Sequence, residues 1–252
     1  FALPLLNGDS EIVLTTELES KGYVDLTKDM LEKFSIHIKN NDYKSFSVRG
    51  NQKYMASDCR IEGDFSQAVF YLAAGLIGDK ICIHGLNINS HQGDKVSIDI
   101  LRRMGAKIEY ENENIISYPS KLNGTVIDAS ECPDIIPVLA AAASVSRGTT
   151  SIINAKRLRM KESDRLKSVR IGLNKLGANV IEKGDSLIIE GKDMLEGGEV
   201  DSFNDHRIVM CMALASIRCK NPVIIHNSGS IKKSYPEFFD DLKSLGGDIR
   251  GE

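Results

Sequence analysis

Three stretches of the sequence repeat one pattern, in which a turn that carries an acid precedes a strongly apolar helix. The acids are Asp64, Asp134 and Asp205. Each stretch then continues into a strand, a polar loop and an amphipathic helix that ends at a glycine. These glycines are Gly105, Gly177 and Gly246, at spacings of 72 and 69 residues. A period of about 70 residues predicts one α/β (α+β) unit repeated three times, with each unit packed on its neighbours.

The apolar helices of the three units are expected over residues 66–76, 135–146 and 205–217. Runs such as "IIPVLAAAASV" are hydrophobic on nearly every side, which predicts buried helices with the other elements packed around them. The strands are expected over residues 80–85, 149–154 and 222–226, and the amphipathic helices over 94–104, 162–176 and 235–245. In the first two units, residues 106–118 and 178–191 alternate apolar with polar positions around a polar turn, which indicates hairpins.

Residues 1–60 fit the same unit from partway in. The expected elements are the end of an apolar helix over 1–6, a strand over 11–17, a loop over 18–24, a helix over 25–34, and strands over 35–40 and 44–50. We therefore expect residues 1–61 to be the remainder of one lobe and residues 62–252 to form a second lobe of three units, with a cleft between the lobes. The chain begins with Phe1 rather than Met, and we expect a longer protein to precede it.

Composition and charge exclude several classes of protein. With 252 residues and 42% apolar content, the chain can bury one large core or two medium ones. A net charge of -3 argues against a general nucleic-acid binder, so any anion site is expected to be local. The longest apolar runs fall short of the roughly 18 residues that a membrane span needs. Five scattered cysteines favour free thiols in a reducing compartment, which predicts a cytoplasmic protein.

A basic segment, "RLRMKESDRLKSVR" from Arg157 to Arg170, joins the strand of the second unit to its amphipathic helix. Lys161 and Arg165 are four positions apart, which predicts that they share one helix face. Like charges at that spacing destabilise a helix by about 0.2–0.5 kcal/mol unless an anion or an acid lies between them. One interpretation is a solvated helix face with acidic counter-charges in the same segment, and the other is an anion-binding site.

A second polar group, "FNDHRIVM", opens the third apolar helix. Asn204 is expected to cap this helix, which places Asp205, His206 and Arg207 in its first turn. Asp205 could serve only the helix dipole, and His206 could be a satisfied interior histidine. Three consecutive ionisable side chains at the mouth of a buried helix are nevertheless costly unless they bind a ligand. Helix N-termini and arginines bind phosphates and carboxylates, and the candidate ligands here are Arg165, Arg207 and Lys233.

Longer segments carry a family resemblance. "ESKGYVDLT", "EGDFSQAVFYLAAG", "PDIIPVLAAAA", "RLRMKESDR", "FNDHRIVM" and "KKSYPEFF" follow one another over essentially the whole chain. In these segments the sequence closely resembles the C-terminal half of the 5-enolpyruvylshikimate-3-phosphate synthases, enolpyruvyl transferases of the shikimate pathway. The resemblance implies an inside-out α/β prism, with two lobes of βαβαββ units around buried helices. It also implies that another part of the active site precedes this chain.

The resemblance implies that the 5-hydroxyl of shikimate 3-phosphate attacks phosphoenolpyruvate, and that the adduct then loses phosphate. By motif match, Asp134 would be the base at the 5-hydroxyl and Glu162 the acid that transfers a proton at the enolpyruvyl methylene carbon. Arg165, Arg207 and Lys233 would bind phosphoenolpyruvate. Asp134, Lys161, Ser20, Tyr23 and Arg157 would bind shikimate 3-phosphate, with Asp205 and His206 in support. The weakest match is Arg157, which stands where the family often has Asn.

Other interpretations remain open. Asp134 and Glu162 could be only acids at helix starts, and a non-catalytic scaffold would keep the apolar helices without the ionisable group. UDP-N-acetylglucosamine enolpyruvyl transferases share the fold, but "KESDR" together with "NDHR" favours the shikimate enzymes. We expect no metal and no other cofactor, because the histidines lack ligand spacing with the cysteines and no nucleotide-type glycine loop is present.

The expected partners are the two small substrates, phosphoenolpyruvate and shikimate 3-phosphate, with neither nucleic acid nor membrane. The full-length protein is expected to be a monomer. The resemblance also implies that both lobes must close over the substrates to complete the site. We therefore expect the 252-residue chain alone to be inactive or nearly so.

Overall fold

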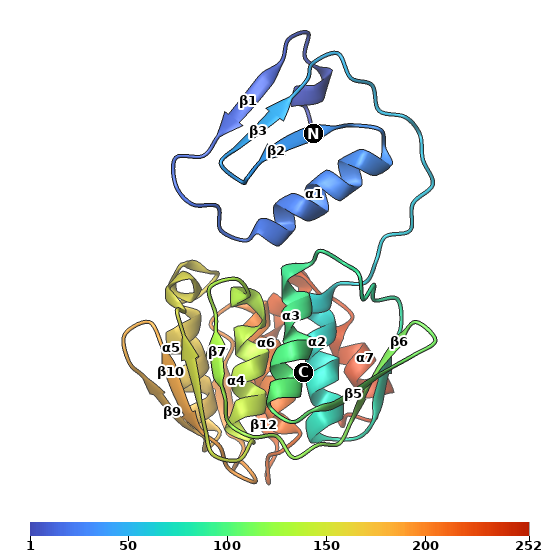
Figure 1. Cartoon of the computed structure of the whole chain (residues 1–252). Coiled ribbons are helices and arrows are strands. Elements are labelled where there is room, and N and C mark those ends of the chain that lie inside the picture. The colour runs from blue at the N-terminus through green and yellow to red at the C-terminus, as the bar shows by residue number, and fades with distance from the viewer. Residues whose placement is uncertain (252) are drawn as a thin grey trace.

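The computed structural model describes residues 1–251 and consists of two lobes joined by an extended segment (Figure 1). In the smaller lobe, helix α1 (Lys21–Lys33) lies beside an antiparallel sheet of order β1-β3-β2. Its strands are β1 (Ser10–Val13), β2 (Ile38–Asn41) and β3 (Ser45–Val48). Residues 49–64 contain neither helix nor strand and lead into the larger lobe. The lobe division at residues 61 and 62 stays a prediction.

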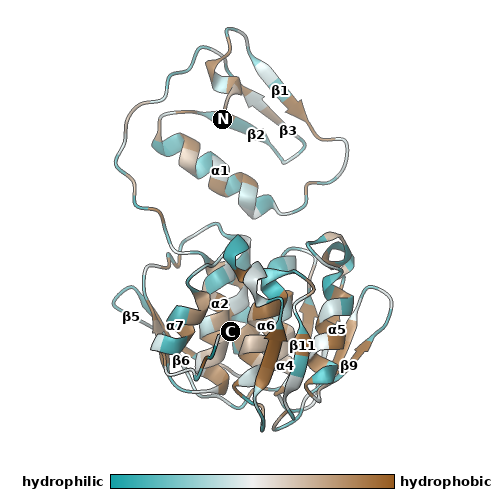
Figure 2. Ribbon diagram, turned by 180° about the vertical axis from the view of Figure 1, so that it is seen from behind, coloured by the Kyte–Doolittle hydropathy of each residue, from teal (hydrophilic) through white to brown (hydrophobic). Residues whose placement is uncertain are grey.

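Three buried helices form the centre of the larger lobe. They are α2 (Phe65–Ile77), α4 (Ile136–Ser144) and α6 (His206–Ser216), and each packs against the other two. Twelve of the 13 residues of α2, all nine of α4 and ten of the 11 of α6 are buried. Their hydrophobic surfaces face one another inside the lobe (Figure 2). The prediction that the apolar helices are buried is therefore confirmed.

The remaining elements of the larger lobe surround these helices. The outer helices are α3 (Val96–Arg103), α5 (Arg165–Lys175) and α7 (Phe238–Ser244). The strands are β4 (Ile81–Ile83), β5 (Lys107–Glu111), β6 (Asn114–Tyr118), β7 (Val126–Asp128), β8 (Thr149–Ile153), β9 (Asn179–Glu182), β10 (Leu187–Glu190), β11 (Gly198–Asp201) and β12 (Val223–His226). They form sheets of order β4-β6-β5, β7-β8-β10-β9 and β11-β12. The antiparallel pairs β5–β6 and β9–β10 are the two predicted hairpins.

The repeated glycines have a common backbone role at the ends of the outer helices. Gly105, Gly177 and Gly246 have φ values of +96°, +92° and +100°, in the region that residues with a side chain rarely adopt. After α5, the amide of Ala178 donates to the carbonyl of Leu173 at 3.0 Å, which closes the helix end. The spacing visible in the sequence therefore marks three equivalent helix terminations.

Several element boundaries differ from the expected ones, and four of them change the local structure most. The chain begins with a single 3₁₀ turn, Leu3–Leu5, and strand β1 ends at Val13. Helix α1 begins at Lys21, within the segment expected to be a loop. Helix α5 begins at Arg165 rather than at residue 162, because Asp164 caps it by accepting from the amide of Lys167 at 3.2 Å. Sequence periodicity does not register such local caps, which decide where a helix begins.

Candidate active site

The three repeated acids lie at the starts of the three buried helices. Asp64 caps α2 by accepting from the amide of Ser66 at 2.8 Å, and Asp205 caps α6 by accepting from the amide of Arg207 at 2.9 Å. Asp205, rather than the expected Asn204, is therefore the N-cap, since Asn204 adopts a left-handed turn at φ +56°. Asp134 lies in the 3₁₀ turn Pro133–Ile135 before α4 and makes no cap hydrogen bond.

Arg165 connects two of these acids. Its side chain is 3% exposed, and it donates from Nε and Nη2 to both carboxylate oxygens of Asp205, at 2.8 and 3.2 Å. Its Nη1 donates to Asp134 Oδ1 at 2.7 Å. Burial lowers the pKa of Arg165, but the hydrogen bonds and charges of Asp205 and Asp134 outweigh that effect and raise the pKa overall. The guanidinium expected to bind an anion is thus already paired with two carboxylates of the protein.

Lys161 approaches Asp134 from the other side. Its Nζ lies 3.1 Å from Asp134 Oδ1, the same oxygen that accepts from Arg165. The prediction that Lys161 and Arg165 share one helix face is wrong, because Lys161 precedes α5 and has extended backbone angles. The acid between the two cations is Asp134, which lies outside the basic segment, whereas the solvated-face interpretation placed the counter-charges within that segment. Burial raises the pKa of Asp134, but Lys161, Arg165 and Arg207 outweigh that effect and hold it below its usual range.

Glu162 joins a second group of charges. Its Oε1 lies 3.0 Å from His206 Nδ1, and its Oε2 lies 3.3 Å from Lys233 Nζ. Lys233 Nζ also donates to the carbonyl of Asn204 at 2.6 Å. Burial lowers the pKa of His206 more than the bond from Glu162 raises it, so the imidazole is neutral at pH 7. The side chains of His206 and Lys233 therefore both contact the carboxylate of Glu162, close enough to exchange a proton with it.

Glu162, Asp205 and His206 also bring possible metal-ligand atoms within 4.8 Å of one another. Both oxygens of Asp205 are, however, bonded to Arg165, and Lys233 contacts Glu162. A divalent cation would have to displace these positive charges to be bound. The charge balance therefore favours an anion at this place rather than a metal.

Arg207 faces the cleft between the lobes. The residue is 7% exposed, and its Nη1 donates to the carbonyl of Ser66 at 2.5 Å. Within residues 1–251, its Nε has no hydrogen-bond partner. The cleft has a volume of about 460 Å³ and is lined by both lobes, with Tyr23 and Leu26 from α1 opposite Arg207. A buried guanidinium with an unused donor at a cleft is suited to bind an anion.

The three remaining candidates lie where the lobes meet. Arg157 donates from Nη1 to Ser20 Oγ at 2.9 Å and to the carbonyl of Ser130 at 3.1 Å. Its Nε lies 3.0 Å from Glu19 Oε2. Arg157 thus links the smaller lobe to the larger one. Tyr23 lies one helical turn beyond Ser20 and contributes to the wall of the cleft.

Arg159 holds the segment that carries Lys161 and Glu162. Its guanidinium lies 3.1 Å from Asp164, 2.8 Å from Glu182 and 2.9 Å from Asp185. It also donates to the carbonyl of Gly184 at 2.6 Å. The cap of α5 and the β9–β10 hairpin are thereby tied to one side chain, which restricts where Lys161 and Glu162 lie.

Asp94 is a cleft residue that sequence reasoning missed. It is 6% exposed, its Oδ2 has no partner within residues 1–251, and burial with nearby carboxylates raises its pKa to about 6. Ser66 and Arg207 favour its ionised form without compensating for burial. Its position in the repeat could have indicated Asp94. In the first unit it lies between the strand and the amphipathic helix, which is the place that the basic segment occupies in the second unit.

We expect Asp94→Asn to increase the free energy of unfolding at pH 7 by about 1–3 kcal/mol, because the wild-type carboxylate is ionised there against its raised pKa. The folded protein binds this proton more tightly than the unfolded chain. The cost of the carboxylate is therefore complete above about pH 6 and disappears as the pH falls below about 4. Urea unfolding of both forms at pH 7.5 and 4 measures the difference. A variant no more stable than wild type at pH 7.5 contradicts this account.

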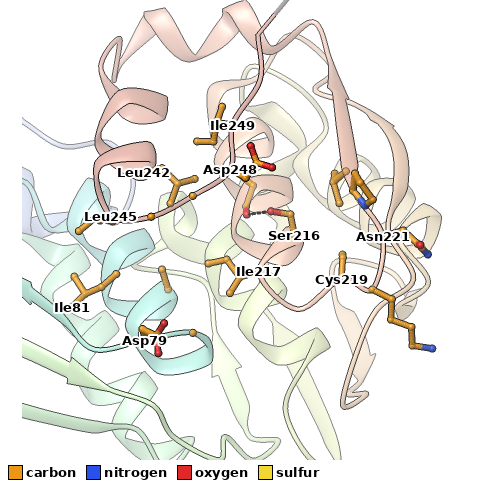
Figure 3. Close-up of a pocket in the computed structure, with 18 of the residues that line it drawn as sticks. Asp79, Ile81, Ser216, Ile217, Cys219, Asn221, Leu242, Leu245, Asp248 and Ile249 are labelled. Carbon is orange, nitrogen blue, oxygen red and sulfur yellow. Dashed lines mark hydrogen bonds between the residues drawn. The ribbon is translucent and has the colours of Figure 1, made fainter.

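A larger cavity lies at the opposite end of the buried helices. It has a volume of about 590 Å³ and is lined by the C-terminal ends of α2 and α6 and by the chain after α7 (Figure 3). Leu242, Leu245, Ile217 and Ile81 give it an apolar wall. None of the candidate catalytic side chains lines it. Of the candidate residues, Tyr23 and Arg207 line the smaller cleft instead.

Comparison with known proteins shows the family of this chain. The sequence model of the family described as EPSP synthase (3-phosphoshikimate 1-carboxyvinyltransferase) matches residues 1–242. The chain belongs to the EPSP synthase family. It is 55% identical over 249 residues to the 3-phosphoshikimate 1-carboxyvinyltransferase of Clostridium novyi (strain NT), covering 99% of this chain and 57% of that one. It is 57% identical over 250 residues to the enzyme of the same name from Clostridium kluyveri, covering 99% of this chain and 58% of that one.

Solved structures of the family share the fold. The 2.37 Å structure of EPSP synthase from Acinetobacter baumannii matches with a TM-score of 0.87 and 26% identity, over 97% of this chain and 58% of that one. The α/β fold expected from the repeats is thus confirmed. The chain spans slightly less than three fifths of the length of the first Clostridium relatives. No helix within residues 1–251 is long and apolar enough to cross a membrane.

Proposed function

We propose that this chain is part of an enzyme that transfers the enolpyruvyl group from phosphoenolpyruvate to the 5-hydroxyl of shikimate 3-phosphate, with release of phosphate. One observation carries the proposal. Asp134, Glu162 and the cations Lys161, Arg207 and Lys233 gather at the mouth of the buried helices, in a member of a family that bears this enzyme's name. The reaction needs a base, an acid and cations for phosphate and carboxylate groups, and this group contains each of them.

Asp134 is suited to the role of base at the 5-hydroxyl. Its lowered pKa keeps the carboxylate ionised at neutral pH, so that it can accept a proton. Lys161 and Arg165 both contact Oδ1 of Asp134. Lys161 would then contact the shikimate 3-phosphate beside the base, with Ser20 and Tyr23 on the opposite lobe.

Glu162 is suited to the proton transfer at the methylene carbon. Lys233 Nζ lies 3.3 Å from its carboxylate. If phosphoenolpyruvate takes Lys233 as a ligand, Glu162 would lie directly beside the bound substrate. His206, at 3.0 Å, would hold the carboxylate in place.

The phosphoenolpyruvate ligands differ in how much rearrangement they require. Arg207 lines the cleft, and its buried Nε has no hydrogen-bond partner within residues 1–251, so Arg207 would give up no carboxylate of the protein. Arg165 is paired with Asp134 and Asp205, so only its Nη1 would turn to a substrate, while Lys161 stays with Asp134. Arg157 bonds to Ser20 and Glu19, and we propose that it joins the lobes rather than replacing the family's Asn at the shikimate ring.

The chemistry needs no cofactor, because proton transfers and fixed cations account for each step. We also propose a cytoplasmic monomer. The support is the group of five free cysteines, which suits a reducing compartment.

A chimera tests the proposal. Residues 1–252 of this chain would replace the matching residues of the Clostridium novyi relative, to which they are 55% identical. We expect phosphate release from phosphoenolpyruvate that depends on shikimate 3-phosphate, at a rate within about tenfold of the unmodified relative. A folded chimera that releases no phosphate, or that accepts UDP-N-acetylglucosamine instead, would exclude the proposed substrate.

The same assay applied to the 252-residue chain alone tests the other expectation. The inactivity of the isolated chain stays a prediction. We expect at least a thousandfold lower turnover than in the chimera, because a site closed from one lobe only leaves the substrates solvated. Turnover by the isolated chain close to that of the chimera would show that residues 1–252 suffice.

A further inference from the structure

A separate group of reactive side chains lies on the outer face of the β4-β6-β5 sheet. Cys82 in β4 and His84 directly after it are two positions apart, so their side chains leave the same face, and both residues are exposed. Cys82 Sγ lies 3.8 Å from His84 Nε2. Asn114, at the start of the neighbouring strand β6, places its Oδ1 2.6 Å from His84 Nδ1. The thiol of Cys82, the imidazole of His84 and the amide of Asn114 are therefore linked by two successive contacts.

The amide decides which imidazole nitrogen faces the thiol as an acceptor. An amide oxygen only accepts hydrogen bonds, so His84 Nδ1 carries the proton that it donates to Asn114. In the neutral imidazole, Nε2 then holds the free electron pair, and it is this atom that lies toward Cys82. A nucleophile within reach of a base, with the base oriented by a third group, is the arrangement that activates thiols and hydroxyls in enzymes.

The surroundings of Cys82 are polar and charged. Lys80, two positions before it on the same face, lies over the ring of Tyr118 at 5.1 Å from the ring centre, and Lys107 lies over the same ring at 4.4 Å. Glu109 on β5 pairs with Lys107 at 3.3 Å. Lys80 has no carboxylate within 4 Å among residues 1–251. Its positive charge attracts a reagent that carries carboxylates.

The other four cysteines are in less reactive surroundings. Burial raises the pKa of Cys132 to about 12 and that of Cys219 to about 11, and it raises the pKa of fully buried Cys211 as well. Cys59 is exposed in the segment between the lobes, without a side-chain hydrogen bond in the described part of the chain. It is therefore an internal reference for an exposed thiol that lacks a base.

We propose that Cys82 is a thiol-modification site that reacts with low-molecular-mass disulfides, with His84 as its base. The Cys82 proton passes to His84 Nε2 while the sulfur attacks one sulfur of the disulfide. The disulfide bond breaks, and the departing thiolate takes the proton from His84. One mixed disulfide at Cys82 and one free thiol result, so that atoms and electrons balance. The site lies outside the candidate active site and does not depend on the proposed function.

The test is the rate of modification of each cysteine in the 252-residue chain. The chain is treated with oxidised glutathione at pH 7, and mass spectrometry of the proteolytic peptides follows Cys82 and Cys59 separately. We expect Cys82 to react about tenfold faster than Cys59, because only Cys82 has a base and a cation beside it. His84→Gln is expected to remove this advantage and to leave the rate at Cys59 unchanged.

Two further variants make the outcome decisive. His226→Gln is the control. It changes an exposed histidine that contacts the carboxylate of Glu199, and it should leave the modification rates of Cys82 and Cys59 unchanged. Asn114→Ala leaves the imidazole without its orienting group and should slow Cys82 by about threefold. Equal rates at Cys82 and Cys59 overturn the proposal, as does an unchanged rate at Cys82 in His84→Gln. Circular dichroism of each variant confirms that the fold is retained.

Discussion

Replacing Arg165 by Met is expected to lower the free energy of unfolding of the 252-residue chain by about 3–5 kcal/mol. Arg165 is 3% exposed on its side chain and pairs with Asp205, which is fully buried, and with Asp134. Without the guanidinium, both carboxylates remain in a poorly solvated place with fewer donors. An unpaired buried charge costs more than the pair contributes, which is why the loss is large.

The pH dependence of this loss follows from the two acids. Their folded-state pKa values lie below the ordinary value, so the stability that they contribute is present above about pH 4 and is lost as the pH falls through the folded pKa. Without Arg165, protonation of the acids removes the uncompensated charge. The difference between Arg165→Met and wild type should therefore shrink below about pH 4.

Urea unfolding, followed by circular dichroism, measures both effects. Lys167→Met is the matched control, because it makes the same substitution on an exposed position of the same helix and should change stability by less than about 0.5 kcal/mol. Adding Asp205→Asn to Arg165→Met should recover part of the loss, since the buried charge disappears while the helix cap stays. An Arg165→Met variant within 1 kcal/mol of wild type contradicts the buried network.

Glu162→Gln in the Clostridium novyi chimera is expected to reduce kcat by about 10²–10⁴-fold, which is the usual contribution of a positioned proton donor. Gln keeps the size of the side chain, and its amide oxygen can accept from one of the two neighbours, His206 or Lys233, but it cannot give or take the proton. KM for phosphoenolpyruvate should change much less than kcat. Steady-state phosphate release, with both substrates varied, separates the two constants.

Glu131→Gln is the control for the loss of one negative charge. Glu131 is exposed in the loop before Asp134 and should change kcat by less than about threefold. Unfolding in urea should show that Glu162→Gln remains folded. A Glu162→Gln chimera with undiminished kcat would show that Glu162 supports the site without taking part in the chemistry. That result would favour the interpretation of this chain as a non-catalytic scaffold.

Much of the architecture could be predicted because its causes are local. The run of apolar residues from Phe65 to Ile77 can only be buried, and Gly177 is needed wherever a helix ends in a left-handed turn. The prediction that Lys161 lies on helix α5 was wrong because it relied on sequence periodicity alone. Periodicity extended helix α5 backward over a polar segment, but the Asp164 cap and the bonds of Arg159 hold that segment outside the helix.

The sequence by itself determined the repeated unit, the buried helices and the list of ionisable residues at their mouths, because hydrophobic pattern and glycine placement depend on neighbours in the chain. Only the tertiary structure decided which charges pair. Arg165 pairs with Asp134 and Asp205, Arg207 has a buried Nε without a partner within residues 1–251, and the carboxyl group of Asp94 is buried. Those outcomes depend on distances and burial between residues that are 31, 40 or 141 positions apart in the chain, and a pairing of that kind leaves no trace in local spacing.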